Sequence, residues 1–366
     1  MRICFLTHNL RKDNGGGVLS RQVIEGLKTA LGAEVSVVTT LSSDFADEQT
    51  LFTPRWFFSP KKLLKIFKLV RGADAVHTFD AFPYGAVAAV LTIFSRIPVF
   101  ITVVGTGSIR YLYLVSTSHL ARFAMKRAKR VIAISDFTKR EILKKVPSAK
   151  VAVIHPGIDI RSLKRDLPEE SFKRPNEFHP YILSVGSLRF RKGYKYAIPA
   201  FKRVSEVFPD LQYVIVGKKY TDKEYNRLRG LVRDFNLEGK VHILHDVNSA
   251  DEALAFYRKA KLFCLMSLNI GHDIEGFGIV FLEAAATGLP VVGSKGCGVE
   301  DATEGGRNGI LVEERNANEF AKAVITILRD ENLYRRFASE SLKLAEDFDW
   351  NKAIDRYASL YRQTLK

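Results

Sequence analysis

Two carboxylates in one glycine-containing segment are the residues best suited to chemistry. Glu275 precedes Gly276-Phe277-Gly278, and Glu283 follows about one turn into a helix expected near residues 279–287. A glycine such as Gly278 lets the first amides of a helix approach a phosphate, and the helix dipole favours that negative charge. Glu283 is placed to accept hydrogen bonds from a ribose, as acidic residues do in dinucleotide sites. The alternative is that the glycines only turn the chain and Glu283 faces solvent.

A second segment combines a strand end with a basic loop and a helix start. Arg189, Arg191 and Lys192 stand between an expected strand at 181–185 and Gly193. A lysine at such a junction can bind a diphosphate as a point charge. The alternative is a solvated basic loop with no ligand.

These residues must be positioned by strands and helices that alternate along nearly the whole chain. Buried strands are expected at 3–7, 34–39, 75–78, 99–104, 131–134, 151–155, 181–185, 211–216, 262–266, 290–293 and 309–312. Residues 14–17 read as a loop, and a helix with an inner apolar stripe follows it. Further helices are expected at 194–208, from the capping box at Ser249 to about 260, and from about 317 to 328. The alternation predicts an α/β protein with parallel, doubly wound sheets.

The apolar periodicity is lost between Ile158 and His179, where the chain is polar and contains prolines. The alternation restarts after this stretch. We therefore expect two Rossmann-like domains, residues 1–162 and 163–347. Ligands of open α/β sheets bind outside the carboxyl ends of the strands, so we expect a site in a cleft between the two domains.

Composition excludes several classes of protein. The 366 residues are 46% apolar and 26% charged, which is typical of a folded protein and not of a disordered one. Three scattered cysteines, Cys4, Cys264 and Cys297, fit neither a disulfide framework nor a zinc site. The first residues run directly into a strand pattern, and the longest apolar run, 81–95, is too short to span a bilayer. We expect a cytoplasmic protein.

The net charge of +16 is concentrated in the first half of the chain. Residues 1–170 carry 26 Lys and Arg against 14 Asp and Glu, whereas the remaining residues carry 30 against 26. Such a field favours an anionic partner, which can be nucleic acid, an anionic lipid surface or a phosphorylated substrate.

In combination, these motifs resemble those of the retaining nucleotide-sugar glycosyltransferases of group 1, which have the GT-B fold. The resemblance covers nearly the whole chain. Its main elements are Lys192-Gly193 after a strand, the Glu275 and Glu283 pair, and the run Ala285 to Val292. Weaker elements, in the same order as in the family, are Gly15-Gly16-Gly17, His77 before Asp80, Ser135-Asp136-Phe137, Pro156 to Asp159, and Trp350.

The resemblance implies a donor bound mainly by the second domain, an acceptor bound mainly by the first, and a final segment, 348–366, that crosses back to the first domain. Lys192 and Glu275 would be the catalytic residues, with Lys192 on the donor diphosphate and Glu275 near the transferred sugar. The other implied donor-binding residues are Gly16, Gly17, Arg189, Arg191, Phe277, Gly278, Ile279 and Glu283. The implied acceptor-side residues are His77, Gly105 and Thr106. The resemblance implies neither a cofactor nor an essential metal.

The family's usual account needs no protein nucleophile. The leaving phosphate oxygen takes the acceptor proton, and fixed charges stabilise the departing diphosphate. This sequence departs from the family pattern at Ser187, Val104 and Phe79, where an arginine and two histidines are common. Arg189 or Arg191 can replace the missing arginine. The departures affect sugar and acceptor identity more than reaction class.

A basic amphipathic helix is expected after an aromatic stretch, Trp56-Phe57-Phe58. Pro60 begins it, its apolar stripe includes Leu63, Ile66, Phe67 and Val70, and lysines cover the rest. We expect the stripe to pack against the first sheet, while the aromatic residues and lysines contact an anionic membrane. The acceptor would then be a glycan, a small molecule or a lipid-linked precursor at the inner face of the membrane.

Two other functions remain open at this stage. A related enzyme can act on nucleotide sugars without transfer, as an epimerase does. A nucleic-acid-binding protein would explain the charge, but no zinc finger, aromatic RNA-binding strand or basic zipper is present in the sequence. We therefore expect no nucleic-acid partner.

Overall fold

The computed structural model describes residues 1–53 and 59–365 and divides into two units. Unit 1 comprises Met1–Gly157 and Trp350–Lys366, and unit 2 comprises Ile158–Asp349. The expected boundary at 162/163 is thus displaced: residues 158–162 belong to unit 2. The chain returns to unit 1 at Trp350 rather than at residue 348. Inside unit 2 the Ile158 amide donates to the Phe348 carbonyl at 2.8 Å, which ties the first and last residues of that unit together.

Unit 1 contains a seven-stranded parallel sheet with strand order β3-β2-β1-β4-β5-β6-β7. The strands are β1 (Arg2–Leu6), β2 (Glu34–Thr39), β3 (Glu48–Thr50), β4 (Ala75–Phe79), β5 (Val99–Val103), β6 (Arg130–Ala133) and β7 (Val151–Val153). β4 and β5 are buried at every position, as strands covered on both faces must be.

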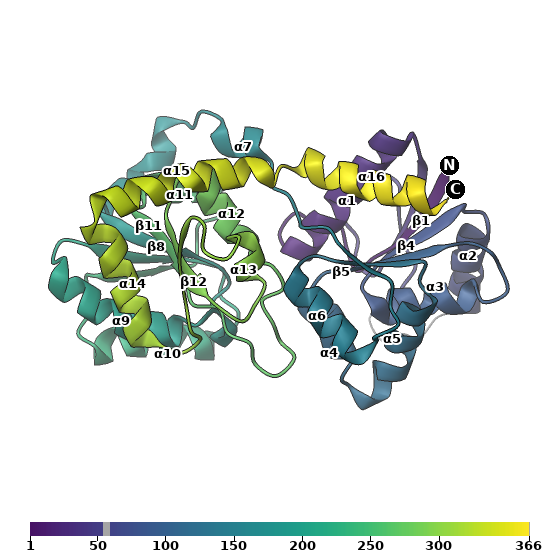
Figure 1. Cartoon of the computed structure of the whole chain (residues 1–366), viewed down its shortest axis with the longest axis horizontal. Coiled ribbons are helices and arrows are strands. Elements are labelled where there is room, and N and C mark those ends of the chain that lie inside the picture. Colours follow the sequence, from purple (N-terminus) through teal and green to yellow (C-terminus); the bar gives the residue numbers. More distant parts are fainter. Residues whose placement is uncertain (54–58, 366) are drawn as a thin grey trace. The chain divides into compact units, whose positions relative to one another are not determined.

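The helices of unit 1 cover both faces of this sheet. They are α1 (Gly15–Leu31), α2 (Pro60–Arg71), α3 (Ala86–Leu91), α4 (Thr106–Tyr111), α5 (Val115–Arg127), α6 (Asp136–Lys145) and α16 (Trp350–Thr364), with a short turn η1 (Ala81–Gly85). Figure 1 shows α1 and α16 on one face and α3 to α6 on the other. The expected return of the final segment to the first domain is therefore confirmed.

Unit 2 contains a six-stranded parallel sheet with strand order β10-β9-β8-β11-β12-β13. The strands are β8 (Tyr181–Val185), β9 (Gln212–Val216), β10 (Val241–Leu244), β11 (Leu262–Leu265), β12 (Val291–Ser294) and β13 (Gly309–Val312). The helices are α7 (Ile160–Lys164), α8 (Lys173–Glu177), α9 (Tyr194–Val207), α10 (Asp222–Asp234), α11 (Ala250–Lys259), α12 (Ile279–Ala286), α13 (Val299–Ala302), α14 (Ala317–Arg329) and α15 (Glu331–Asp347), with turns η2 (Glu169–Phe172) and η3 (Phe190–Lys192). In Figure 1 the helices α7, α11 and α15 cover one face of this sheet, and α9, α10 and α14 cover the other.

Both sheets confirm the expected Rossmann-like, parallel α/β architecture. In each sheet the strand order reverses next to the unit's first strand, between β1 and β4 and between β8 and β11. Such a reversal leaves an opening at the carboxyl edge, where the two loops diverge to opposite faces. The loops after β8 and β11 contain Lys192 and Glu275. The reversal in unit 2 therefore lies next to the two segments in which the sequence analysis predicted functional residues.

Local rules account for most helix starts. Ser135 and Ser249 accept hydrogen bonds from backbone amides at the starts of α6 and α11, as expected. The loop expected at residues 14–17 is wrong: Gly15 to Gly17 form the first turn of α1, because the Asn14 side chain accepts from the Gly17 amide at 2.8 Å. The segment between Ile158 and His179 also contains helices rather than irregular chain. Arg165 and Arg174 anchor it by ion pairs to Asp251 and Asp246.

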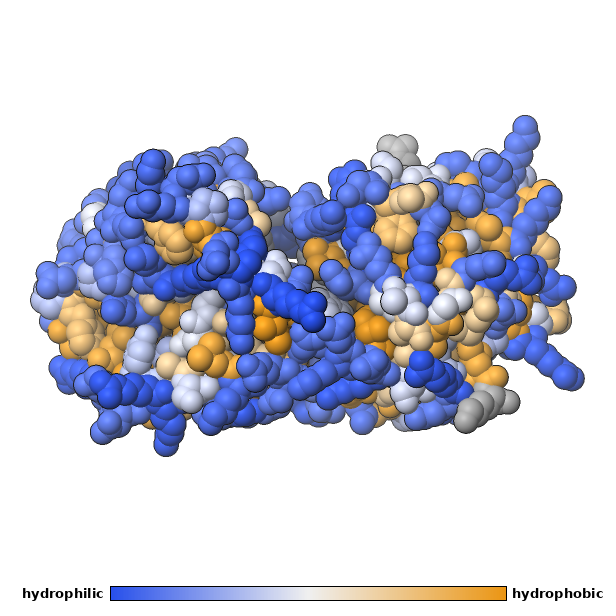
Figure 2. Space-filling view, turned by 90° about the horizontal axis from the view of Figure 1, so that it is seen from above, coloured by the Kyte–Doolittle hydropathy of each residue, from blue (hydrophilic) through white to orange (hydrophobic). Residues whose placement is uncertain are grey.

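The helix expected at Pro60 is α2, but its apolar stripe is only partly covered. Ile66 and Val70 are fully buried, whereas Leu63, Leu64 and Phe67 are exposed. The aromatic residues expected to lead into it, Trp56 to Phe58, lie outside the described residues. Apolar residues reach the surface among hydrophilic ones in Figure 2. None of the helices in the described parts of the chain is long and apolar enough to cross a membrane.

Candidate functional site

The loop after β8 is held against the end of β11 by a glycine contact. Gly193 has a φ of 70°, and a Cβ at this position would lie 1.7 Å from the Met266 carbonyl oxygen. Only glycine permits this approach without displacing the backbone. The Leu268 amide also donates to the Arg191 carbonyl at 2.7 Å. The basic loop is therefore fixed to the segment that leads to Glu275.

Lys192 and Glu275 form a buried ion pair at this junction. The Lys192 ammonium lies 2.5 Å from Glu275 Oε2, and the Arg191 guanidinium lies 3.0 Å from the same oxygen. Ser267 donates a hydrogen bond to that oxygen at 3.0 Å. Lys192 is 8% exposed and Glu275 is 9% exposed. One carboxylate oxygen thus contacts two cations, and Arg191 also forms an ion pair with Asp273 at 3.2 Å.

The electrostatics of this pair keep Glu275 ionised. Burial by itself raises the pKa of the Glu275 carboxyl, but the charges of Lys192 and Arg191 and the hydrogen bonds from Lys192 and Ser267 outweigh it and lower the pKa to about 2. Glu275 is therefore an anion over the whole physiological pH range, which makes it an orienting group for cations and not a proton donor.

Glu283 experiences the opposite shift. It lies on α12, and Tyr257 on α11 donates to its Oε2 at 2.8 Å. Burial raises the pKa of Glu283, while the Tyr257 hydrogen bond and the charge of Lys192 partly offset the rise. The Lys192 charge thus acts on both carboxylates. Two acids near one cation have pKa values moved apart, which is common at functional sites and indicates different roles.

The start of α12 supplies a third element. Gly278 precedes the helix with a φ of 90°, and no side chain caps its first turn. The first amides of a helix have no partner inside the helix, so they are suited to an anion. The Glu275 carbonyl accepts from the Gly298 amide at 2.9 Å, which anchors the segment between the two carboxylates. Phe277 is buried against this anchor, and Ile279 is half-buried at the helix start.

Together these elements have the chemistry that an anion site needs. Two cations, an uncapped helix start and a hydroxyl-binding carboxylate lie at the point where the strand order of unit 2 reverses. A phosphate group would be bound by charge and amides, and a neighbouring sugar hydroxyl by Glu283.

The second arginine of the basic loop lies elsewhere. The Arg189 guanidinium is stacked 3.8 Å from the centre of the Tyr220 ring, and the residue is exposed. Of the two arginines expected to replace the one absent at Ser187, Arg191 joins the buried cluster and Arg189 does not. A donor-binding role for Arg189 is therefore not supported by its position.

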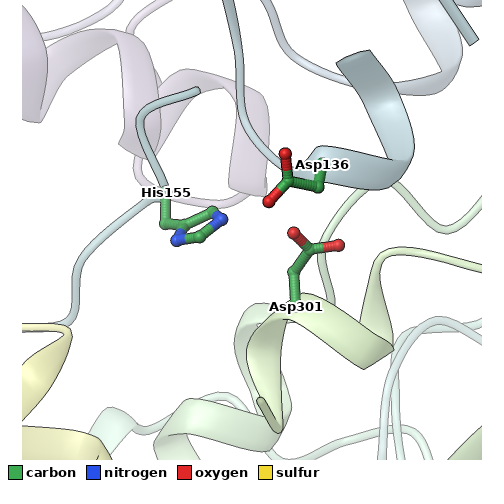
Figure 3. A group of neighbouring side chains, drawn as sticks. All are labelled: Asp136, His155 and Asp301. Atoms are coloured by element: carbon green, nitrogen blue, oxygen red, sulfur yellow. The ribbon is translucent and has the colours of Figure 1, made fainter. Parts of the chain in front are cut away.

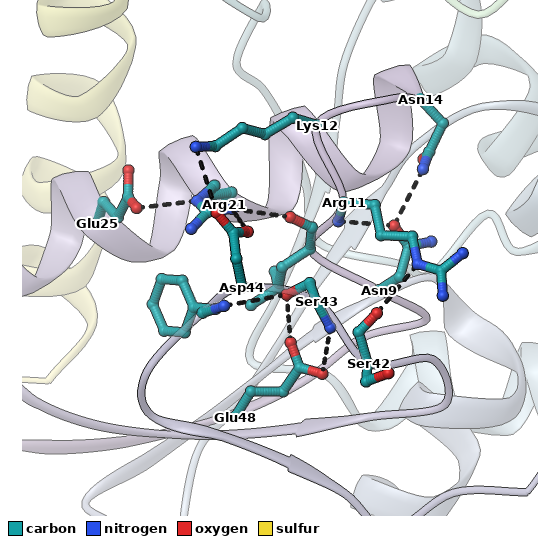
Figure 4. Close-up of polar contacts among 12 residues, drawn as sticks. Asn9, Arg11, Lys12, Asn14, Arg21, Glu25, Ser42, Ser43, Asp44 and Glu48 are labelled. Carbon is teal, nitrogen blue, oxygen red and sulfur yellow. Dashed lines mark hydrogen bonds and ion pairs between the residues drawn. The ribbon is translucent and has the colours of Figure 1, made fainter.

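In unit 1 the glycine segment is held by asparagines (Figure 4). Asn9 Oδ1 accepts from the Arg11 amide at 3.0 Å and from the Asn14 amide group at 3.1 Å. A Cβ on Gly17 would lie 2.2 Å from the Arg11 carbonyl oxygen, so this glycine is required for packing. Its amide already donates to Asn14. Gly17 therefore has a structural role, and its donor-binding role stays a prediction, as does that of the half-buried Gly16.

His77 is a structural residue, which corrects the acceptor-side role expected for it. It is fully buried, with Nδ1 hydrogen bonded to the Tyr361 hydroxyl at 2.8 Å and Nε2 to the Thr102 hydroxyl at 2.8 Å. Burial lowers the pKa of His77 to about 3, so the ring is neutral. Its two hydrogen bonds connect β4 to β5 and to α16.

The remaining acceptor-side candidates surround Asp80. Gly105 has a φ of 115° and precedes α4, and Thr106 is half-buried in the first turn. The Asp80 carboxylate accepts from the Ser108 hydroxyl and from the Val104 amide, the latter at 3.4 Å. Burial raises the pKa of Asp80. Gly105 and Thr106 remain predicted acceptor-side residues at the carboxyl edge of β5.

Three residues with metal-binding side chains belong to different units. Asp136 lies at the start of α6 and His155 follows β7, both in unit 1, whereas Asp301 lies on α13 in unit 2 (Figure 3). Because the two units are described separately, we assign no ligand set to these residues.

Sequence reasoning missed two residues of the unit 2 site. Tyr257 is a helix residue near the capping box, and Ser267 follows β11 with no motif around it. Neither has a local signal, because the fold alone brings them to the two carboxylates. The position of Ser267 at a strand end next to the order reversal is the one feature that could have marked it.

Comparison with known proteins places the chain in a family. A family model described as "Glycosyl transferases group 1" matches residues 168–343, and one described as "Glycosyltransferase Family 4" matches residues 13–162. The Glu275, Glu283 and Lys192 cluster lies within the first match, and the asparagine-held glycine segment lies within the second.

Individual relatives agree with these matches. An uncharacterized glycosyltransferase of Methanocaldococcus jannaschii is 24% identical over 80% of this chain and 76% of its own length. The N-acetyl-alpha-D-glucosaminyl L-malate synthase of Bacillus anthracis is 27% identical over 80% of this chain and 75% of its own length. The crystal structure of Anabaena HepE in complex with UDP has a TM-score of 0.84 at 19% identity and covers 99% of this chain and 100% of that one. The chain belongs to the group 1 glycosyltransferases and has the GT-B fold.

Proposed function

We propose that the protein moves a hexosyl group from a nucleoside diphosphate sugar to an acceptor, with retention of configuration at the anomeric carbon. The observation that carries the proposal is the buried cluster of Lys192, Arg191 and Glu275 beside Glu283. It brings two cations together where the strand order of unit 2 reverses. The solved relative HepE has been crystallised with UDP and with UDP-glucose, which supports a nucleotide-sugar donor of this kind.

The donor's diphosphate is bound by Lys192, Arg191 and the first amides of α12. Glu283 accepts hydrogen bonds from the ribose, and Tyr257 holds its carboxylate in place. Glu275 keeps Lys192 and Arg191 oriented and contacts the transferred sugar. Gly16 of unit 1 stays a predicted donor-binding residue. The proposed reaction uses no cofactor besides the donor substrate.

In the reaction, the bond between the anomeric carbon and the diphosphate oxygen breaks, and a bond to the acceptor oxygen forms on the same face. The acceptor's hydroxyl proton passes to the leaving phosphate oxygen. Lys192 stabilises the negative charge that develops on the diphosphate. Such electrostatic stabilisation is usually the largest single contribution to the rate enhancement of an enzyme. The products are the glycosylated acceptor and a nucleoside diphosphate.

We propose that the acceptor is presented at an anionic membrane surface. On α2, Leu64 is 53% and Phe67 40% exposed, and lysines flank both. Beside them an apolar hollow of about 300 Å³ is lined by Leu63, Phe82, Pro83, Ala86, Val87, Val90, Leu91 and Leu120. An amphipathic helix with basic and exposed apolar residues binds anionic lipid both by electrostatic attraction and by burial of its apolar side chains.

This membrane contact is tested by flotation with phosphatidylglycerol vesicles. The wild type should float with the vesicles, whereas Leu64→Ser/Phe67→Ser should remain unbound. Equal flotation of both proteins, or none of either, would refute a membrane role for α2.

The donor is tested by thermal shift with UDP, GDP and ADP sugars. A ligand at about 100 times its Kd stabilises the native state by about 2.7 kcal/mol, so the matching donor should raise the Tm by roughly 5–10 °C. Glu283→Ala should abolish most of this shift, because the ribose contact is lost. The control is Glu206→Ala, which removes an exposed carboxylate from α9 in the same unit.

Product analysis then decides between transfer and other chemistry. Incubation with the identified donor and candidate acceptors should release nucleoside diphosphate together with a glycoside whose anomeric configuration, read by NMR, matches that of the donor. A glycoside of inverted configuration would refute retention but would leave glycosyl transfer supported. An epimerised nucleotide sugar without any glycoside would refute transfer.

A further inference from the structure

The first sheet has a second hollow at the edge opposite its carboxyl ends. A cavity of about 560 Å³ lies where β4, β5, β6 and β7 begin. Its lining includes Arg96, Lys126, Arg127, Lys129 and Lys150, and also Thr364 and Leu365 at the end of α16. Because ligands of Rossmann-like sheets bind at the carboxyl edge, this cavity is separate from the glycosyl transfer site.

The cavity's position follows from the strand starts. Lys129 and Lys150 directly precede β6 and β7, which are paired neighbours in the sheet. The Lys129 amide donates to the Val99 carbonyl at 2.8 Å, and the Lys150 carbonyl accepts from the Val131 amide at 3.0 Å. These backbone bonds fix where the two lysine side chains emerge. The end of α5 adds Lys126 to the same hollow.

Among the described residues of this lining, the cations outnumber the single carboxylate. Arg127 has a structural role, because it donates to the carbonyl of Thr92 at 3.0 Å. Among the described residues, Arg96, Lys126, Lys129 and Lys150 form no ion pair. The one acidic residue of the lining, Asp74, accepts from the Arg2 amide at 2.8 Å. Thr364 contributes a buried hydroxyl for which residues 1–53 and 59–365 supply no hydrogen-bond partner.

Four unpaired cations around one hollow repel each other, and an anion removes that cost. A hydroxyl without a partner in the same lining fits an anion that carries several acceptor oxygens. We propose that this cavity is a second anion site, which binds a phosphate group through Lys126, Lys129, Lys150, Arg96 and the Thr364 hydroxyl. The phosphate can belong to a free phosphorylated metabolite or to a phospholipid headgroup.

The site is tested by lysine footprinting on the intact protein. Acylation of lysines by an N-hydroxysuccinimide ester is followed by mass spectrometry with inorganic phosphate, with monomeric dihexanoyl phosphatidic acid, and with dihexanoyl phosphatidylcholine. Phosphate or the phosphatidic acid should protect Lys126, Lys129 and Lys150 at least roughly threefold, while exposed Lys223 and Lys322 react unchanged. Protection by both anions indicates a free phosphate ligand, and protection by the phosphatidic acid alone indicates a headgroup.

Affinity measurements on variants complete the test. By titration calorimetry at low ionic strength, Lys126→Gln/Lys129→Gln/Lys150→Gln should bind the protecting anion about tenfold or more weakly, because each cation contributes a charge-assisted hydrogen bond. The matched control, Arg203→Gln/Lys223→Gln/Lys322→Gln, removes three exposed charges from unit 2 and should bind as the wild type does.

Absence of protection by either anion would overturn the proposal, as would equal weakening in both triple variants, which would mean a general charge effect. Protection confined to Lys192 would also overturn it, because the anion would then occupy only the donor site. None of these outcomes bears on donor binding by unit 2, which the thermal-shift and product measurements test separately.

Discussion

The two units bury polar groups in opposite ways. In unit 1, His77 is neutral, and both of its ring nitrogens are hydrogen bonded to hydroxyls. In unit 2, Glu275 is ionised and shares one oxygen between Lys192 and Arg191. The first network is neutral and its hydrogen bonds are internal, whereas the second gathers the charges of Lys192, Arg191 and Glu275 at a reversal of strand order. A buried group of charged side chains at such a reversal therefore indicates a functional site better than a buried, neutral and fully hydrogen-bonded residue does.

The largest effect is expected from removing the anion of the unit 2 cluster. Glu275→Gln leaves the buried Lys192 without its ion-pair partner and Arg191 with Asp273 alone, which should cost about 3–5 kcal/mol of stability near neutral pH. The lowered pKa of Glu275 stabilises the fold above about pH 4.5, and this contribution is lost as the pH falls from 4.5 towards 2. The difference between wild type and variant should therefore shrink over that range in urea denaturation. The control Glu206→Gln should show no such convergence, and a constant difference would contradict the ion-pair assignment.

Removing the cation should act on turnover. Lys192→Ala should lower kcat on the order of 10²-fold, as loss of a transition-state charge stabiliser does in other enzymes. The matched control is Lys195→Ala, an exposed lysine in the following helix, which should retain activity. Initial rates of nucleoside diphosphate release measure both variants. Equal activity of the two would show that Lys192 does not contact the leaving group.

The hydrogen-bond network around the neutral His77 should make the stability of the protein depend on pH below about 6.5. Since burial lowers the pKa of His77 to about 3, only the unfolded state takes up the proton as the pH falls from 6.5. Stability should then decline by up to about 1.4 kcal/mol per pH unit through this group. His77→Gln should flatten that decline, whereas His119→Gln, at an exposed histidine of α5, should not. Urea midpoints at pH 7, 6 and 5 provide the readout, and an unchanged slope in His77→Gln would argue against the buried neutral ring.

The smallest effect separates the two arginines of the basic loop. Arg189→Ala should change donor affinity by less than about twofold, because its guanidinium is stacked on Tyr220. Arg191→Ala should weaken donor binding by roughly tenfold through loss of a charge-assisted hydrogen bond. Titration calorimetry with the preferred nucleotide sugar compares them. A reversed order would mean that the loop rearranges when the donor binds.

Much of the fold and the centre of the site could be predicted from the sequence. The alternation of apolar strands and helices predicted two parallel sheets, because strands buried on both faces must be continuously apolar. Lys192, Glu275 and Glu283 were predicted because each lies beside a strand end or a helix start. The acceptor-side role predicted for His77 was wrong. The position of His77 near a strand end does not reveal that α16, which is distant in the sequence, covers it. Tyr257 was missed because its hydroxyl reaches Glu283 only through the packing of α11 on α12.

One consequence concerns the connectivity of the chain. Unit 2 is a single uninterrupted stretch inserted between the two pieces of unit 1. The last helix supplies Tyr357 and Tyr361, both buried in the core of unit 1. Unit 2 can therefore be replaced by that of a relative as one continuous segment. Removal of the last helix would instead expose the core of unit 1.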